Sequence, residues 1–152
     1  MSTRSYIGKV EKDGSIKAIY CHWDGYISNN GRILESSYKD EKKIDELLSL
    51  GALSSLGEEI GNKVDFDKRI SDTDYYERTK NQCVSYWRDR GEEFSIHESK
   101  NLPEFEKFIK KIAWDAEYVY LFNNGEWFVW KTSKNGKNKW KKLSEEVLKT
   151  ED

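Results

Sequence analysis

The sequence lacks the features of a disulfide framework, a metal centre or a membrane segment. Its 152 residues contain two cysteines, Cys21 and Cys83, which are too few for a disulfide scaffold or a cysteine-based metal site. No N-terminal stretch is typical of a signal peptide, and no apolar run approaches the length of a membrane span. A single proline, Pro103, argues against long disordered linkers. We therefore expect a reduced, cytoplasmic protein that does not contact the membrane.

An excess of charge of one sign is also missing. The 26 Lys and Arg residues nearly balance the 28 Asp and Glu residues, so the formal net charge is −2. A chain with this balance has no global field that attracts nucleic acid or an acidic membrane surface. The sequence contains no Walker loop and no GxGxxG, CxxC or HExxH motif, and so lacks support for the common cofactor and metal classes. We expect no cofactor and no metal.

Aromatic rings are what the chain has in abundance. Apolar residues make up only 36% of it, but six Trp, nine Tyr and six Phe give an aromatic share of 14%. Each buried ring contributes about 150–250 Å² of contact area, which offsets the shortage of aliphatic side chains. The length suits one compact domain. We expect residues 1–152 to form a single domain whose core is built largely from rings.

Turn signals and apolar spacing predict the fold class. Asp13-Gly14 separates two β-type segments, TRSYIGKV and IKAIYCHW, and Asn124-Gly125 separates EYVYLF from EWFVWK. Apolar residues at helical spacing predict about four helices, the clearest over 72–90. The chain is therefore predicted to be an α+β protein, with an antiparallel sheet of two hairpins, about four to five strands, and the helices packed on it.

The first hairpin gathers polar and aromatic side chains at the end away from its turn. If Asp13 and Gly14 are the two loop residues, Arg4 lies opposite Trp23 and the two form a cation–π pair. The alternation of a strand then places three polar residues on one face. They are Ser5, His22 and Asp24.

These residues allow a catalytic interpretation and a structural one. Ser5, His22 and Asp24 have the residue types of a nucleophile, a base and an orienting carboxylate, which is the pattern of a small hydrolase or nuclease. That function requires an exposed His22 within about 3 Å of a partner. The structural alternative is that His22 packs at the sheet edge and Asp24 opens a turn.

The same strand end is the candidate binding surface. Arg4 beside an indole could grip a phosphate and stack on a base, or could simply close the hairpin. Arg88 and Arg90 follow at a predicted helix C-terminus, where cations complement the helix dipole and could also reach this surface. The candidate residues for binding a ligand or a partner are Thr3, Arg4, His22, Trp23, Asp24, Tyr26, Arg88 and Arg90.

A lysine-rich segment gives a weaker signal. Residues 131–142 contain six lysines and no acid, and lysines beside an indole suit phosphate contacts and base stacking. A charged loop is more often only solvated, and the balanced net charge makes nucleic acid an unlikely partner. The candidate residues for phosphate contact are Lys137, Lys139, Trp140 and Lys141.

Several motifs together resemble a family of small phage, prophage and mobile-element proteins. The motifs are STRSYIG, IYCHWDGY, NNGRIL, LGALSSLGEEIG, YWRDRGEE and YLFNNGEWFVW, and they cover most of the chain except about 62–81 and the lysine-rich segment. The resemblance brings no catalytic residues. It implies an effector that binds and inhibits a host protein, such as a defence component like a CRISPR complex.

Two alternatives to that function stay open. One is a protein that binds and sequesters a nucleotide-like small ligand through Arg4, Trp23 and Tyr26, which predicts a concave pocket at the strand end. The other is the small hydrolase or nuclease that uses His22 and Asp24.

Overall fold

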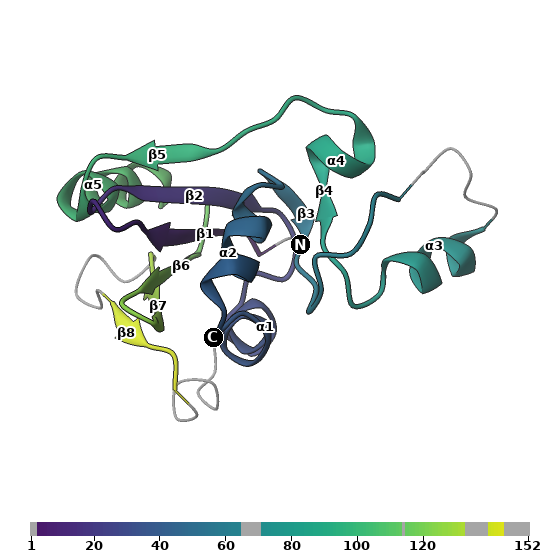
Figure 1. Ribbon diagram of the computed structural model, residues 1–152, viewed down its shortest axis with the longest axis horizontal. Coiled ribbons are helices and arrows are strands. Elements are labelled where there is room, and N and C mark those ends of the chain that lie inside the picture. Colours follow the sequence, from purple (N-terminus) through teal and green to yellow (C-terminus); the bar gives the residue numbers. More distant parts are fainter. Residues whose placement is uncertain (1–2, 65–70, 114, 133–139, 145–152) are drawn as a thin grey trace.

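The computed structural model describes residues 3–64, 71–113, 115–132 and 140–144 (Figure 1). Within these residues, eight strands form one sheet. The strands are β1 (Ser5–Val10), β2 (Ile16–Cys21), β3 (Leu53–Ser55), β4 (Val84–Ser85), β5 (His97–Ser99), β6 (Tyr118–Asn123), β7 (Glu126–Lys131) and β8 (Lys141–Lys142). The helices are α1 (Arg32–Ser37), α2 (Glu41–Leu48), α3 (Asp72–Thr79), α4 (Tyr86–Arg90) and α5 (Leu102–Ile112), and a π-helical turn, η1 (Ile27–Gly31), precedes α1.

The sheet is mixed, with both predicted hairpins at its centre. Its order is β4-β3-β2-β1-β6-β7-β8, and β5 pairs with the first half of β2. The hairpins β1–β2 and β6–β7 are antiparallel, but β1 runs parallel to β6 and β2 runs parallel to β3. The predicted α+β class is confirmed. The predicted sheet is only partly correct, because short segments extend it at both edges and two of its pairings are parallel.

The predicted register of the first hairpin is wrong by one residue. Tyr6 pairs with Tyr20, and Ser5 faces Cys21 rather than His22. The N–H of Glu11 donates to the carbonyl of Ser15 at 2.7 Å, so the loop has three residues and not two. Such loops end in a left-handed residue, and Gly14 takes this role at φ +88°. A one-residue shift exchanges the faces of every paired side chain, so Arg4 does not lie opposite Trp23.

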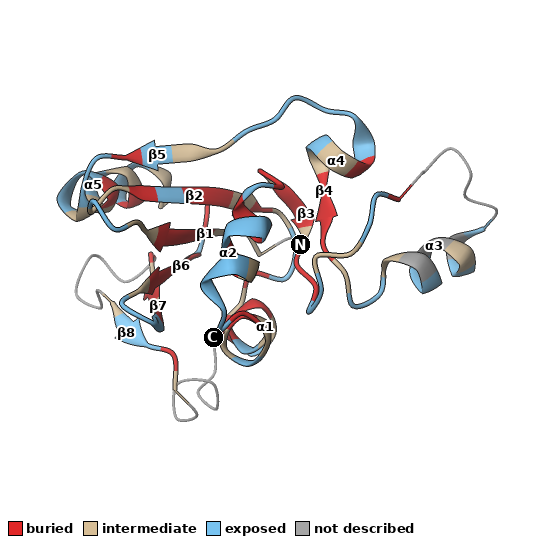
Figure 2. Ribbon diagram, viewed as in Figure 1, coloured by how far each residue is buried: buried red, intermediate tan, exposed pale blue. Residues whose placement is uncertain are grey.

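Each face of the sheet carries its own apolar core. On one face, Ile7 and Ile19 pack with Leu34 of α1 and with Leu47 of α2. On the other face, α5 packs on Ile16, Ala18, Val119, Leu121 and Trp130 through its buried residues Phe105 and Ile109. Figure 2 shows the buried residues concentrated on the central strands and on the inner sides of the helices. Rings contribute to both cores, as the composition predicts.

The helix predicted over 72–90 is two helices with a strand between them. α3 ends at Thr79, Asn81 adopts φ +68°, and the N–H of Cys83 donates to the carbonyl of Glu59 at 2.9 Å. Ser85 then caps α4 by accepting from the N–H of Arg88 at 3.0 Å. α3 itself projects from one end of the molecule, away from the sheet (Figure 1). None of the helices in the described ranges is long and apolar enough to cross a membrane.

Candidate functional site

The strand end after β2 is held in a bent path by backbone contacts. The N–H groups of His22 and Trp23 donate to the carbonyls of Leu53 and Ser54, both at 3.0 Å. Asp24 then takes a left-handed conformation at φ +55°, and the N–H of Gly25 donates to the carbonyl of Thr3 at 2.7 Å. Strand alternation therefore stops before Asp24.

Gly25 fills a position where no side chain fits. A Cβ atom there would lie 2.8 Å from both the Cβ of Ser5 and the carbonyl oxygen of Thr3. Its own carbonyl accepts a hydrogen bond from the hydroxyl of Tyr120 at 2.6 Å. Tyr26 follows, half-buried against the core of the α1 and α2 face. The DGY part of the motif therefore fastens the strand end to the sheet.

An aromatic row leads out of the sheet to Trp23. The hydroxyl of Tyr20 and Nδ1 of His22 lie 2.8 Å apart, and the rings of His22 and Trp23 meet edge to face at 4.7 Å. The side chain of Trp23 is 45% exposed. Burial raises the pKa of Tyr20 to about 12, against the opposing effect of the Arg4 charge, so its hydroxyl stays protonated. The Trp23 indole thus packs on His22, whose hydrogen-bonded neighbour Tyr20 stays uncharged.

Arg4 is engaged by carboxylates that follow α5. Its guanidinium forms an ion pair with Asp115, and its backbone N–H donates to the carboxylate of Glu117 at 2.8 Å. About 38% of the Arg4 side chain stays exposed, so the pair lies at the surface. Its Nε is shielded from solvent and has no hydrogen-bond partner. Arg4 therefore lies at the strand-end surface. Asp115 holds it there, and it does not pair with Trp23.

The geometry does not assemble the Ser-His-Asp arrangement. Ser5 is fully buried, and the side-chain amide of Asn30 donates to its hydroxyl at 3.2 Å. It shares the α1 and α2 face with Cys21, whereas His22 follows Tyr20 on the alternate face. The proposed nucleophile and base are thus on opposite sides of the sheet. Burial also raises the pKa of Cys21 to about 12, so that thiol is no substitute nucleophile.

Arg88 is a structural arginine. Only 14% of its side chain is exposed; it pairs with Asp89 at 3.0 Å and donates to the carbonyls of Ile60, Gly61 and Cys83. Asp89, fully buried in its side chain, accepts in turn from the N–H groups of Val64 and Ser85. This node ties the segment before residue 65 to α4. Of the two α4 arginines predicted to bind a ligand or a partner, Arg90 is the exposed one. Its guanidinium lies over the ring of Tyr86 and 3.6 Å from the carboxylate of Glu92.

Trp140 faces the interior rather than a nucleic acid. Its ring stacks on Phe105 at 6.4 Å and meets Trp130 edge to face at 5.2 Å, while its N–H donates to Glu106 at 3.1 Å. Lys141 lies exposed on β8. Lys137 and Lys139 fall outside the described residues. The packing of Trp140 accounts for its presence without a base-stacking role.

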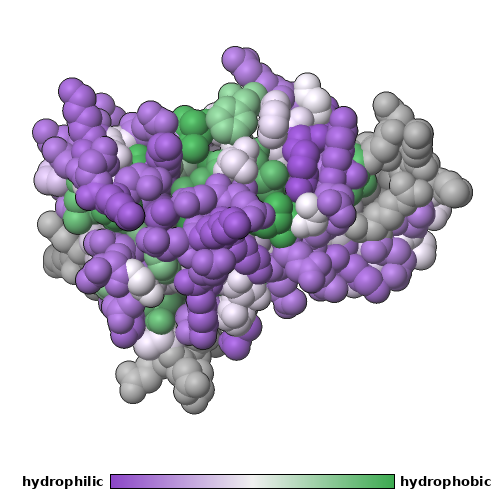
Figure 3. Space-filling model, viewed as in Figure 1, coloured by the Kyte–Doolittle hydropathy of each residue, from purple (hydrophilic) through white to green (hydrophobic). Residues whose placement is uncertain are grey.

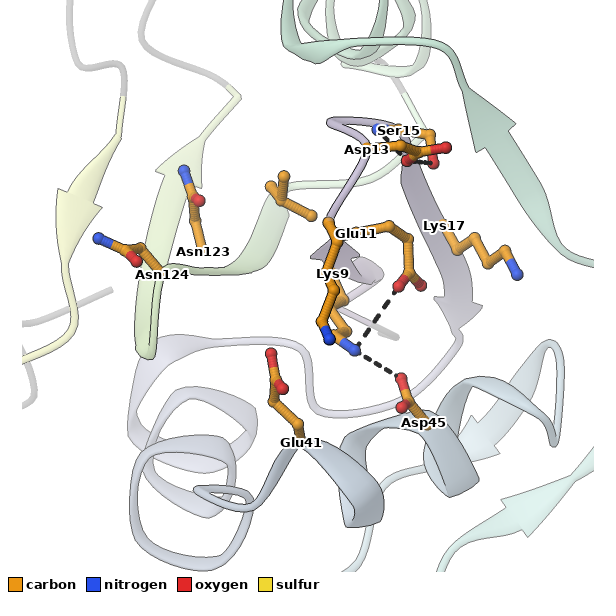
Figure 4. Close-up of a pocket in the computed structure, with 11 residues that line it drawn as sticks. Lys9, Glu11, Asp13, Ser15, Lys17, Glu41, Asp45, Asn123 and Asn124 are labelled. Carbon is orange, nitrogen blue, oxygen red and sulfur yellow. Dashed lines mark hydrogen bonds and ion pairs between the residues drawn. The ribbon is translucent and has the colours of Figure 1, made fainter.

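A wide cleft lies at the other end of the first hairpin. This cleft has a volume of about 960 Å³ and is bordered by α2, the β1–β2 turn and the β6–β7 turn (Figure 4). At its side, the ammonium of Lys9 bonds to Asp45 at 2.8 Å and lies 3.6 Å from Glu11. Only 8% of the Lys9 side chain is exposed. Burial lowers the pKa of Lys9, but the hydrogen bond to Asp45 and the nearby carboxylates outweigh it, so the net pKa is raised and the ammonium keeps its charge.

A second cleft continues the first along α2. It has a volume of about 420 Å³ and shares Glu11, Lys17 and Asp45 with the first. Beyond them it is lined by Leu48 on one side and, on the other, by the segment that leads into β5. Figure 3 shows hydrophobic atoms between α2 and this segment, on a face that is otherwise largely hydrophilic. We call the two clefts together the α2 groove.

The α2 groove was not predicted from the sequence, although one residue of it carries a signal. Lys9 occupies an inward position in the alternation of β1, between Ile7 and the turn, and a lysine at such a position signals a carboxylate partner on the covering helix. That signal was present, but the position of α2 on this face was not predictable from local patterns. Among the described residues, those of the groove included, no group of three or more His, Cys, Asp or Glu residues is arranged to hold a metal ion.

Comparison with known proteins assigns no family. No family model, no curated protein and no solved structure matches the chain. The resemblance to small phage proteins therefore stays a prediction from the motifs, and function has to be argued from the geometry.

Proposed function

We propose that this protein is a non-catalytic binding protein that contacts a partner protein through the strand-end surface around Trp23. The observation that carries the proposal is the half-exposed indole, which projects from a backbone fixed to β3 and rests edge-on against His22. Trp and Arg dominate the energetics of protein interfaces, and a side chain that is already ordered loses little entropy on binding. The surface-exposed Arg4–Asp115 pair supplies polar contacts on the same hairpin end.

The motif resemblance favours a host protein that a phage protein inhibits, such as a defence component. Of the two predicted arginines of α4, Arg90 is exposed and accessible to a partner, whereas Arg88 is committed to its buried node.

The experiment compares two exposed tryptophans of this chain. Trp23 and Trp87 are 45% and 47% exposed, so Trp23→Ala and Trp87→Ala remove similarly exposed rings from two different elements, the strand end after β2 and helix α4. Tagged wild type and both variants, each checked for folding by circular dichroism, would be used to capture proteins from a bacterial lysate with quantitative mass spectrometry. We expect a partner that is retained by wild type and Trp87→Ala and lost with Trp23→Ala. Equal capture by all three proteins would contradict the proposal.

A nucleotide-like ligand is the second candidate at this surface. The favouring observation is that Arg4, whose Nε has no hydrogen-bond partner, and the exposed Trp23 both lie at the open end of the β1–β2 hairpin. A phosphate could accept from the guanidinium while a base stacks on Trp23. Isothermal titration with adenosine diphosphate tests this alternative: binding that is lost in Trp23→Ala supports it, and an absence of heat with wild type removes it.

A further inference from the structure

The α2 groove joins a charged half to an apolar half along one helix face. Glu41, Asp45 and Leu48 are spaced by four and three residues, which places them on the same side of α2. Glu41 and Asp45 border the charged half, where Figure 4 shows both side chains directed toward the cleft beside Lys9. Leu48 begins the apolar half, opposite Phe94 and Ile96.

The charged half has more carboxylates than ammonium groups. Four carboxylates and three lysines line the first cleft, and Glu98 adds a fifth carboxylate in the second, so the lining of the whole groove has a net charge of −2. Lys9 is already neutralised by Asp45 and Glu11. Lys17 lies directly across from Glu98 in the pairing of β2 with β5. The groove is therefore complementary to a cation, and its lysines do not reverse that preference.

The apolar half is open enough to receive a side chain. Phe94 is 41% exposed although its ring contacts Trp87 edge to face at 5.5 Å. Ile96 is only partly buried, against the core of the α1 and α2 face. An apolar side chain placed between Phe94, Ile96 and Leu48 would cover this surface and lose its own contact with water.

The distance between the halves sets the spacing of a ligand. The midpoint of Glu41 and Asp45 is five residues from Leu48, or about 7.5 Å along the helix axis. Side chains two positions apart on an extended peptide lie about 6.7 Å apart on the same face. We propose that the α2 groove binds an extended peptide segment of a partner protein, with a lysine or arginine in the charged half and an aliphatic residue two positions away in the apolar half.

This site is separate from the strand-end surface, so either proposal can fail alone. The probe is a fluorescein-labelled peptide, Gly-Ser-Lys-Thr-Leu-Ser-Gly, whose binding to the full chain is followed by fluorescence anisotropy. Control peptides replace the lysine by glutamate or place leucine directly after it. We expect the first peptide to bind best, with an affinity that falls as salt screens the charges.

Matched variants of the protein locate the binding. Glu41→Lys reverses a charge inside the groove, and Glu46→Lys reverses one on the same helix outside it; each is exposed in the folded protein. We expect Glu41→Lys to weaken binding about fivefold, the range of one exposed charge contact, and Glu46→Lys to change it far less. A second pair of variants tests the apolar half: the peptide affinity of Phe94→Ser, which removes an exposed ring from the groove, is compared with that of Tyr76→Ser, which removes one from α3. Equal effects of the two charge reversals, equal binding of all three peptides, or no binding at millimolar peptide would each overturn the proposal.

Discussion

Among single residues, Lys9 allows the clearest prediction about the free energy of unfolding. Its ammonium is nearly buried, whereas its partner Asp45 is 56% exposed. Removing the partner of a buried charge costs more than removing the charge itself. We expect Asp45→Ala to lower the free energy of unfolding by about 1–3 kcal/mol, because Lys9 then keeps only the weaker attraction of Glu11 and Glu41.

The reverse substitution gives the matching control. Lys9→Met keeps most of the side-chain volume and removes the buried charge, and the carboxylates left behind are hydrated. We expect a change below about 1 kcal/mol in urea denaturation. If Lys9→Met lowered the free energy of unfolding more than Asp45→Ala, the ion pair itself would be the stabilising element, and the unpaired buried charge would not be the main cost.

His97 makes stability depend on pH. Its ring stacks on Phe108 with centroids 3.5 Å apart, and burial lowers its pKa although the charges of Glu104 and Glu98 act in the opposite direction. The folded protein then binds the proton less readily than the unfolded chain. The stabilising contribution is complete above the unfolded pKa of about 6.5 and decreases as pH falls from there through the lower folded pKa.

Thermal unfolding of wild type and His97→Gln between pH 7.5 and 5 measures this effect. We expect the stability of wild type to fall more steeply with acidification than that of the variant. Parallel pH profiles would show that the ring contributes to packing without contributing to the pH dependence.

At the scale of elements, sequence signals correctly predicted the features that depend only on residues near one another in the chain. Asn124-Gly125 fixed the second hairpin, and the alternation of its first strand matches the two cores, with Tyr120 on one face and Val119 on the other. Asp40 caps α2 and Pro103 lies in the first turn of α5, as the local preferences of these two residue types favour. Each of these features depends on residues within one turn or one strand.

One error was local, and the others came from contacts between distant segments. Asp13-Gly14 has the composition of a two-residue turn, but Asp13 instead accepts from the N–H and hydroxyl of Ser15 in a three-residue loop. Residues 80–85 have helical spacing, but pairing with the segment around Glu59 breaks the helix. The carboxylate partner of Lys9 lies 36 positions away on α2. The inward position of Lys9 signals a carboxylate partner, but no pattern along the chain identifies which carboxylate it is.

β8 depends on one indole for its attachment to α5. Trp140 stacks on Phe105, contacts Trp130 and bonds to Glu106, just before the short strand begins. We expect Trp140→Ala to lower the free energy of unfolding by about 2–4 kcal/mol, as for a largely buried ring. Lys141→Ala, on the exposed strand that follows, should change stability by less than about 0.5 kcal/mol.

A nucleic-acid role for Trp140 would give the opposite result. Trp140→Ala would then fold as stably as wild type and would lose affinity for a single-stranded oligonucleotide. Chemical denaturation together with anisotropy of a labelled poly-dT strand separates the two roles.

In the whole molecule, the first hairpin connects the two candidate binding regions. Its turn end borders the α2 groove, and its open end carries Arg4 and Trp23. The two regions share strands β1 and β2 but no lining residue. A partner protein with an extended arm could contact both, and the linked contacts would raise its apparent affinity through effective concentration.

The same strands also separate the two cores, so the cores should unfold together. Leu47 of α2 and Ile109 of α5 pack on opposite faces of one sheet, and neither face retains its strands if the other is lost. We expect Leu47→Ala and Ile109→Ala each to lower the free energy of unfolding by about 2–5 kcal/mol. Each variant should unfold in one transition, with coincident curves from far-ultraviolet circular dichroism and tryptophan fluorescence. If either variant unfolded in two steps, each face would be a separate cooperative unit, and the sheet would not couple the α2 groove to the rest of the protein.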